Sequence, residues 1–128
     1  MMSEKDSTNL FVLVVEDADD ARHLMRLGLE ELGYVVLEAD NGVSAVEIAL
    51  RERPNIILMD LSLPIMDGLE ATMKIRSDEH MRDTQIIAVT AHQEADFREG
   101  AKASGFDAYV TKPIDFEWLS ELIKGLLV

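Results

Sequence analysis

Short apolar runs recur along this chain, and each of them is too short to form a helix. They are rich in Val, Ile and Leu and lack the polar alternation of a half-exposed strand, so they predict strands that are buried on both faces. The runs lie at Leu10–Val15, Tyr34–Leu37, Ile56–Met59, Ile86–Val89 and Ala108–Val110. A sheet built from such strands needs cover on both of its faces.

Segments with helical spacing separate the runs. In the first segment an apolar stripe is formed by Ala21, Leu24, Met25, Gly28, Leu29 and Leu32, with Arg22, Arg26, Glu30 and Glu31 outside it. Gly33 predicts a left-handed cap at the end of this helix. Further helices are expected at 42–52, 68–77 and 96–104, the last closed by Gly105. The final helix carries Leu119, Leu122, Ile123 and Leu126 and begins after Asp115, a favourable N-cap.

Strands that alternate with helices in this way predict a doubly wound α/β domain, because each parallel crossover needs a helix-sized connection. We expect the flavodoxin-like sheet of five parallel strands in the order 2-1-3-4-5, with five helices. The length of 128 residues fits one domain, which we place at 10–128 behind a flexible polar tail at 1–9. Ligands of such sheets bind beyond the carboxyl ends of the strands, so the residues that follow each run are the candidates for chemistry.

Composition excludes several classes of function. Twelve basic residues against twenty-five acidic ones give a net charge of -13, which repels phosphate backbones and anionic lipids, so we expect no nucleic-acid and no membrane partner. The chain has no cysteine, which excludes disulfides and thiolate metal sites and fits a reducing compartment. The three histidines are scattered and form no set of zinc ligands. No apolar stretch approaches a bilayer span, and we expect a cytoplasmic protein.

Residues that could take part in chemistry, most of them polar, follow four of the five runs. They are Glu16 and Asp17 after the first run, Asp60 after the third, Thr90 after the fourth, and Thr111, Lys112 and Pro113 after the fifth. Any one of these acids, taken alone, would be interpreted as a solvated surface charge, and Thr90 as an ordinary strand residue. If the first and third strands are neighbours, however, a strand spacing of about 4.8 Å brings Asp17 and Asp60 into one small cavity.

Carboxylates held so close repel each other unless a cation lies between them. Oxygen ligands without Cys or His nearby favour a hard ion, and Mg²⁺ fits best. Lys112 and Thr90 could then hold the oxygens of a transferring phosphoryl group, with Asp60 as the nucleophile that forms an acyl phosphate. The acidic stretch at 16–20 stands where a glycine-rich phosphate loop would be, so a nucleotide pyrophosphate would be repelled.

Four motifs in this order resemble the signatures of response-regulator receiver domains. They are Val14-Val15-Glu16-Asp17, the stretch from Met59-Asp60 to Asp67-Gly68, Val89-Thr90-Ala91, and Tyr109-Val110-Thr111-Lys112-Pro113. The resemblance covers residues 10–127 and is closest to the stand-alone receivers of the CheY and DivK types, because nothing follows the last helix. The Met1-Met2-Ser3 start is likewise what we expect of a complete protein.

The resemblance implies a phosphoacceptor of a two-component system or phosphorelay. Asp60 would accept a phosphoryl group from a phosphohistidine on a sensor histidine kinase or a histidine phosphotransfer protein. Asp17, Asp60 and the backbone carbonyl of Ser62 would bind Mg²⁺, with Glu16 binding it directly or through water. Lys112 would bridge the acids and the phosphoryl group.

The resemblance also implies a conformational switch. Thr90 would move its hydroxyl toward the phosphoryl group, to which the small Ala91 leaves access, and Tyr109 would turn inward in response. This movement would reshape the face of the fourth helix, fifth strand and fifth helix, which binds a downstream protein target. The Lys112–Pro113 peptide bond is expected to be cis. We expect a monomer or a weak homodimer.

Two other functions remain open. A phosphatase of the haloacid-dehalogenase type uses an Asp nucleophile and Mg²⁺ on a similar sheet, but it needs a second Asp two residues later, where Ser62 stands. A degenerate receiver would act as an interaction module without phosphate, and the complete set of acids, Thr90 and Lys112 argues against it.

Glu16 stands where many receivers have Asp. Ser62 and His92 occupy positions that influence the attack of water, so the lifetime of the phosphorylated state stays open between seconds and hours.

Overall fold

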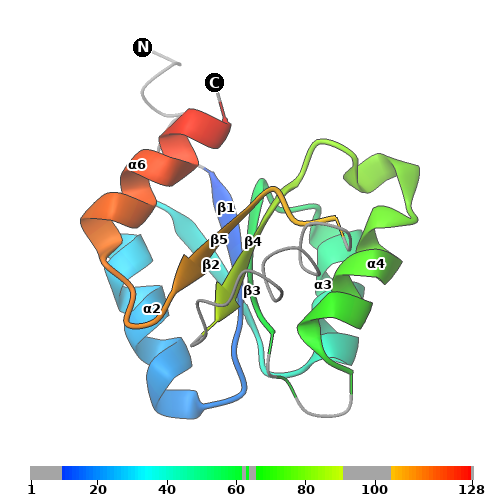
Figure 1. The fold of residues 1–128 in the computed structure, drawn as a ribbon, viewed down its shortest axis with the longest axis horizontal. Helices are drawn as coiled ribbons and strands as arrows, with labels where there is room; N and C mark the ends of the chain where they lie inside the picture. The colour runs from blue at the N-terminus through cyan, green and yellow to red at the C-terminus, as the bar shows by residue number, and fades with distance from the viewer. Residues whose placement is uncertain (1–9, 62, 64–65, 91–104, 128) are drawn as a thin grey trace.

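A parallel sheet with the strand order β2-β1-β3-β4-β5 forms the centre of the molecule (Figure 1). The structure is a computed structural model in which residues 10–61, 63, 66–90 and 105–127 are described. The strands are β1 (Phe11–Val15), β2 (Val35–Ala39), β3 (Ile56–Asp60), β4 (Gln85–Thr90) and β5 (Ala108–Thr111). The predicted fold class and strand order are therefore confirmed.

Helices cover both faces of the sheet, as Figure 1 shows: α2 and α6 lie on one face, and α3 and α4 on the other. The helices are α2 (Asp19–Glu31), α3 (Gly42–Glu52), α4 (Gly68–Arg76) and α6 (Phe116–Leu126), with a short 3₁₀ helix, η1 (Glu79–Met81), after α4. The described part of the chain thus holds four of the five expected α-helices. The helix expected at 96–104 and the tail at 1–9 lie outside the described residues.

Two apolar layers hold the sheet between the helices. Because successive strand residues point to opposite faces, Ile57 and Met59 of β3 join the core under α3 and α4, while Ile56 and Leu58 join the core under α2 and α6. All five residues of β3 are buried, including Asp60. The continuous apolar runs in the sequence reflect this burial on both sides.

Several boundaries differ from the expected ones for local reasons. Helix α2 begins at Asp19, before the first residue of the apolar stripe, Ala21, because its acidic first turn favours the helix dipole but carries no apolar signal. Strand β2 extends to Ala39, past the polar Glu38, because both residues pair with β1.

Gly33 has a φ of 99°, which confirms the left-handed position at the end of α2. Asp115 accepts a hydrogen bond from Trp118 N at 3.1 Å, as expected of an N-cap.

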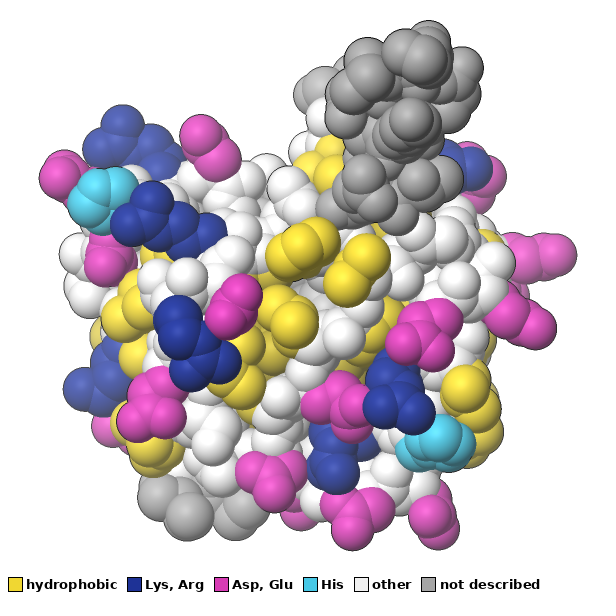
Figure 2. All heavy atoms as spheres, turned by 180° about the vertical axis from the view of Figure 1, so that it is seen from behind, with side chains coloured by type: hydrophobic (Ala, Val, Ile, Leu, Met, Phe, Trp, Pro, Cys, Tyr) yellow, Lys and Arg dark blue, Asp and Glu magenta, His cyan; other side chains and the backbone are white. Residues whose placement is uncertain are grey.

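The surface charges are interspersed on the face turned away from the view of Figure 1. Figure 2 shows acidic and basic side chains there around a group of hydrophobic ones. The negative net charge therefore does not produce a surface of one sign on this face. Among the described residues, no helix combines the length and the apolar character that a bilayer crossing requires.

Candidate functional site

One lysine joins two buried carboxylates that come from distant parts of the chain. The Nζ atom of Lys112 donates hydrogen bonds to Oε1 of Glu16 at 3.0 Å and to Oδ2 of Asp60 at 3.2 Å. Glu16 is 2% exposed and Asp60 is 4% exposed. Buried charges of this kind persist in a folded protein because they are paired and hydrogen-bonded. The structure thus brings Glu16, Asp60 and Lys112 together, as predicted.

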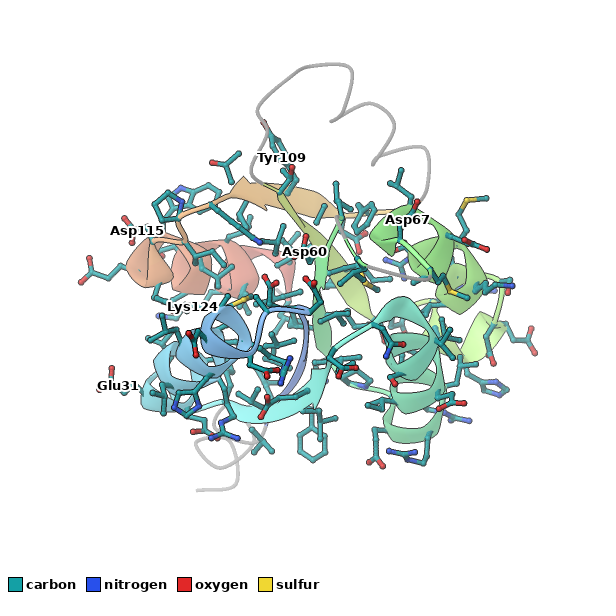
Figure 3. All side chains as sticks on the ribbon, turned by 90° about the horizontal axis from the view of Figure 1, so that it is seen from below. Glu31, Asp60, Asp67, Tyr109, Asp115 and Lys124 are labelled. Carbon is teal, nitrogen blue, oxygen red and sulfur yellow. The ribbon has the colours of Figure 1, made fainter. Side chains whose placement is uncertain are left out.

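The strand order explains why these residues meet. Glu16 follows β1, Asp60 ends β3, and Lys112 follows β5, so all three lie at the carboxyl edge of one sheet. Figure 3 looks onto this edge and shows Asp60 near its middle, with Tyr109 and Asp67 farther out.

An acidic cluster surrounds this pair of contacts. Glu16, Asp17 and Asp60 each offer a carboxylate oxygen, and the three oxygens lie within 4.8 Å of one another. Asp17 is exposed, whereas the other two are buried. Lys112 carries only one positive charge against these three carboxylates, so the cluster favours a further cation, and its purely oxygen donors fit a hard divalent ion such as Mg²⁺.

The electrostatics of Lys112 agree with its position. Burial alone would lower its pKa, but the hydrogen bond and charge of Glu16 and those of Asp60 outweigh burial and raise the pKa above the ordinary value of 10.5. The side chain is therefore a cation at neutral pH. The peptide bond between Lys112 and Pro113 is cis, as expected.

Thr90 is the last residue of β4, and its side chain is buried at the same edge of the sheet. The backbone N of Lys112 donates a hydrogen bond to the Thr90 carbonyl at 2.8 Å. The residue before Thr90, Val89, pairs with Asp60 across the sheet. The chain segments that carry the predicted hydroxyl, nucleophile and cation are thus fixed relative to one another.

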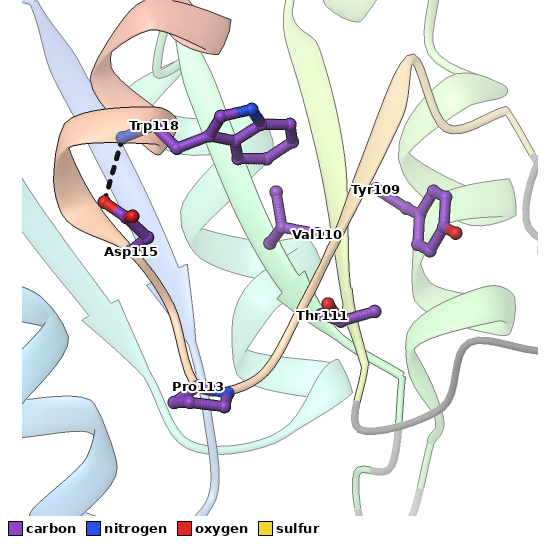
Figure 4. Close-up of a pocket in the computed structure, with 6 residues that line it drawn as sticks. All are labelled: Tyr109, Val110, Thr111, Pro113, Asp115 and Trp118. Atoms are coloured by element: carbon purple, nitrogen blue, oxygen red, sulfur yellow. Dashed lines mark hydrogen bonds between the residues drawn. The ribbon is translucent and has the colours of Figure 1, made fainter.

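Tyr109 lies on β5 and separates two environments. It is half-buried against the core under α3 and α4, and it also lines a groove of about 500 Å³ with Val110, Thr111, Pro113, Asp115 and Trp118. Figure 4 shows Tyr109 pointing to one side of β5, whereas Val110 points toward the ring of Trp118 on the other side. Trp118 is 53% exposed. The predicted switch residue is therefore next to an open groove between β5 and α6.

Close backbone approaches position the loop that follows Asp60. A Cβ atom on Gly68 would clash with the carbonyl oxygen of Asp60, and one on Gly42 would clash with that of Met66. Only glycine fits such contacts. Asp67 caps α4 by accepting a hydrogen bond from Glu70 N at 2.8 Å, and Met66 packs against the core.

Some predicted positions cannot be compared with the structure. Ser62, Ala91 and His92 lie outside the described residues. The other two histidines, His23 and His80, are exposed.

Sequence reasoning missed Arg22, which touches the site through the backbone. Its Nη1 atom donates a hydrogen bond to the carbonyl oxygen of Glu16 at 2.9 Å. The sequence places Arg22 outside the apolar stripe of α2, which is typical of a solvated residue. The one available signal is its spacing of three residues from Asp19, with which it forms an ion pair.

Comparisons with known proteins agree on one family. The family model of the response regulator receiver domain matches residues 12–124. The polar-differentiation response regulator DivK of Brucella anthropi is 37% identical over 116 residues, which cover 91% of this chain and 94% of that protein.

Solved structures of receivers are similar over nearly the whole chain. The receiver domain of the sensor histidine kinase PA1611 from Pseudomonas aeruginosa, with a magnesium ion coordinated in its active-site cleft, has a TM-score of 0.87 and 34% identity, covering 93% of this chain and 98% of that chain. The chemotaxis protein CheY4 of Vibrio cholerae has a TM-score of 0.87 at 27% identity, covering 92% of this chain and 98% of that chain.

The fold and the site together define a phosphoaccepting α/β signalling domain. The chain belongs to the response regulator receiver domain family. It is a response regulator of two-component signalling, a switch rather than an enzyme that acts on a separate substrate. The comparisons give no support to the phosphatase alternative.

Proposed function

We propose that Asp60 is the phosphoacceptor and that its donor is a phosphohistidine on a sensor histidine kinase or a histidine phosphotransfer protein. A carboxylate oxygen of Asp60 attacks the phosphorus, the bond from phosphorus to the imidazole nitrogen breaks, and its electron pair returns to that nitrogen. Water later attacks the acyl phosphate and releases inorganic phosphate and the free carboxylate. The observation that carries the proposal is the contact of Lys112 with Asp60 inside the acidic cluster.

Each neighbouring residue has a defined contribution to this transfer. Lys112 supplies a fixed positive charge for the phosphoryl oxygens, and the Thr90 hydroxyl supplies a donor from the same edge. Glu16, Asp17 and Asp60 would hold Mg²⁺, with the backbone carbonyl of Ser62 as a further ligand. When bound there, the ion neutralises charge that develops on the transferring phosphoryl group.

The output of the switch is proposed to be the face around Tyr109. Phosphorylation replaces the single negative charge of a buried aspartate carboxylate by about two on the phosphoryl group, which changes the relative free energies of two conformations that already exist. Movement of Thr90 toward the new charge would let Tyr109 turn inward. Because Tyr109 lines the groove beside Trp118, this turn would change the groove that a downstream protein target contacts.

The remaining expectations complete this proposal. We place a single receiver domain at 10–128, in the cytoplasm, as a monomer or weak homodimer without a nucleic-acid or membrane partner. The acidic net charge of -13 supports the last point. Light scattering during gel filtration, with and without phosphorylation, tests the oligomeric state.

Phosphorylation with acetyl phosphate and Mg²⁺ tests the central claim. Intact-mass spectrometry should show the gain of one phosphoryl group in the wild type and its loss in Asp60→Asn. Asp67→Asn is the matched control, because it removes an exposed carboxylate from the same loop yet keeps a side chain that can cap α4. We expect the control to be phosphorylated like the wild type.

Two results would contradict the proposal. One is a folded wild type that takes up no phosphoryl group from acetyl phosphate or from a phosphorylated histidine phosphotransfer domain. The other is a mass gain that persists in Asp60→Asn. Sustained turnover of phosphate esters would instead favour the phosphatase alternative.

A further inference from the structure

Arg22 makes three side-chain contacts that connect α2, β2 and the site. Its Nη1 donates to the carbonyl oxygen of Glu16 at 2.9 Å, its Nε donates to Oε1 of Glu38 at 3.0 Å, and its Nη2 donates to Oδ1 of Asp19 at 2.7 Å. The side chain is only 17% exposed. Glu38 is held in turn by Nη1 of Arg26 at 2.7 Å. The guanidinium is therefore fixed on two sides while it holds the backbone of Glu16.

The backbone of Glu16 is anchored on its other side as well. Its N donates a hydrogen bond to the Ala39 carbonyl of β2 at 3.1 Å. Its side chain accepts from Ala18 N at 3.1 Å through Oε2 and from Lys112 through Oε1. The contact with Arg22 fixes the remaining polar group of the residue, the carbonyl.

That carbonyl belongs to the peptide unit that leads into Asp17. The atoms of a peptide unit lie close to one plane, so holding the Glu16 oxygen also sets the direction of the Asp17 N–H and the position of its Cα. Asp17 is exposed, and within the part of the chain that the structure describes its side chain makes no hydrogen bond. Its carboxylate is thus directed into the cluster mainly by its backbone.

We propose that Arg22 is a positioning residue for the divalent cation, because it holds the Glu16–Asp17 peptide unit in the orientation that directs the Asp17 carboxylate to the cluster. The inference rests on the proposed function, in which Asp17 is a metal ligand. Residues that orient metal ligands commonly change metal affinity by about 10-fold to 100-fold when they are replaced.

Charge and position predict opposite results for the loss of Arg22. If Arg22 acted only as a nearby positive charge, its removal would strengthen the binding of a divalent cation, because one repulsive charge would be gone. If it positions Asp17, its removal weakens binding. The sign of the change therefore separates the two explanations.

Calorimetric titration of the full chain with Mg²⁺, in the absence of phosphate donors, is the test. We expect Arg22→Ala to weaken Mg²⁺ binding by about 10-fold or more. Arg22→Lys keeps the charge, but an ammonium cannot span the Glu16 carbonyl and Glu38 as a guanidinium does, so it should also weaken binding. Arg26→Ala is the matched control, since it removes the same charge and a contact with the same Glu38 without touching Glu16; its affinity should stay within about twofold of the wild type, because no ligand moves.

A second measurement reports the geometry directly and does not depend on metal. In spectra of the ¹⁵N-labelled chain without Mg²⁺, the amide signal of Asp17 should shift in Arg22→Ala and in Arg22→Lys, and remain near its wild-type position in Arg26→Ala. Urea unfolding of each variant shows that the compared proteins are folded.

The outcomes distinguish this inference from the proposed site. A wild type that binds Mg²⁺ and an Arg22→Ala variant that binds it equally well or more tightly would overturn the positioning role alone. A folded wild type that binds no Mg²⁺ would overturn the proposed metal site, and the positioning role with it.

Discussion

Replacing Lys112 by methionine removes the ammonium that contacts both buried carboxylates, while it keeps an unbranched side chain of similar length. Glu16 and Asp60 then remain buried without the cation that now lies 3.0 and 3.2 Å from them. With an effective dielectric constant of about 20, each of these contacts corresponds to a Coulomb energy of about 5 kcal/mol. Most of that energy is offset by the cost of taking the charges out of water.

The net loss of stability follows from what the variant leaves behind. Removal of one partner from a buried ion pair typically costs about 3–5 kcal/mol. The Lys112 side chain is 35% exposed, so solvent already screens part of the interaction, and we expect the low end of that range, about 3 kcal/mol. Lys124→Met is the control: Lys124 is 67% exposed and lies 4.0 Å from Glu121, so its loss should cost less than about 1 kcal/mol.

Urea unfolding, followed by circular dichroism at neutral pH with a chelator present, measures both variants. Saturating Mg²⁺ should then stabilise Lys112→Met more than the wild type, because a divalent cation meets less repulsion once the ammonium is gone. If the free energies of unfolding of Lys112→Met and Lys124→Met differ by less than about 1 kcal/mol, the buried ion pairs of Lys112 do not stabilise the fold as described. If Mg²⁺ raises the free energy of unfolding of Lys112→Met and of the wild type equally, the ammonium does not repel the divalent cation.

Three further predictions follow from burial, close contact and charge. The pKa of Lys112 is raised, so its contribution to stability is complete below pH 10.5 and is lost as the pH rises through the folded-state pKa. The difference in free energy of unfolding between the wild type and Lys112→Met should therefore disappear at alkaline pH. A series of urea unfolding curves in which that difference stays constant with pH would contradict this. Gly125→Ala should raise the free energy of unfolding by about 0.5 kcal/mol, since a Cβ there meets no atom within 4 Å. Gly42→Ala should lower it by about 2 kcal/mol, because the new Cβ would clash with the Met66 carbonyl. Thermal unfolding that ranks the two variants in the opposite order would contradict this. Leu58→Ala should cost about 3 kcal/mol in urea unfolding, since Leu58 is fully buried, and a loss below about 1 kcal/mol would show that the core refills the space.

The sequence was sufficient to predict the strands and the residues at their ends, because burial on both faces leaves an unbroken apolar run that stops at the edge of the sheet. Asp60 and Thr90 were identified from that position, and they form the last residues of β3 and β4. The edge strand β2 was predicted less well. Its outer side is only partly covered, so Glu38 interrupts the apolar pattern although the strand continues to Ala39.

Contacts made through the backbone could not be predicted in the same way. Arg22 binds the carbonyl of Glu16, and a carbonyl is present at every residue, so no pattern of side chains marks the contact. Gly42 matters because α3 begins against the Met66 carbonyl, a proximity that only the packed loops create. Both features depend on how neighbouring elements meet, whereas the acids and Lys112 follow from the order of the strands alone.

The groove between β5 and α6 contains the only tryptophan of the chain, Trp118. Its indole ring is about half exposed, so its fluorescence is sensitive to whatever replaces water on that surface. The protein therefore carries a built-in optical reporter on the face beside Tyr109, and emission that shifts to shorter wavelength when a binding protein is added would locate that protein there without any attached dye.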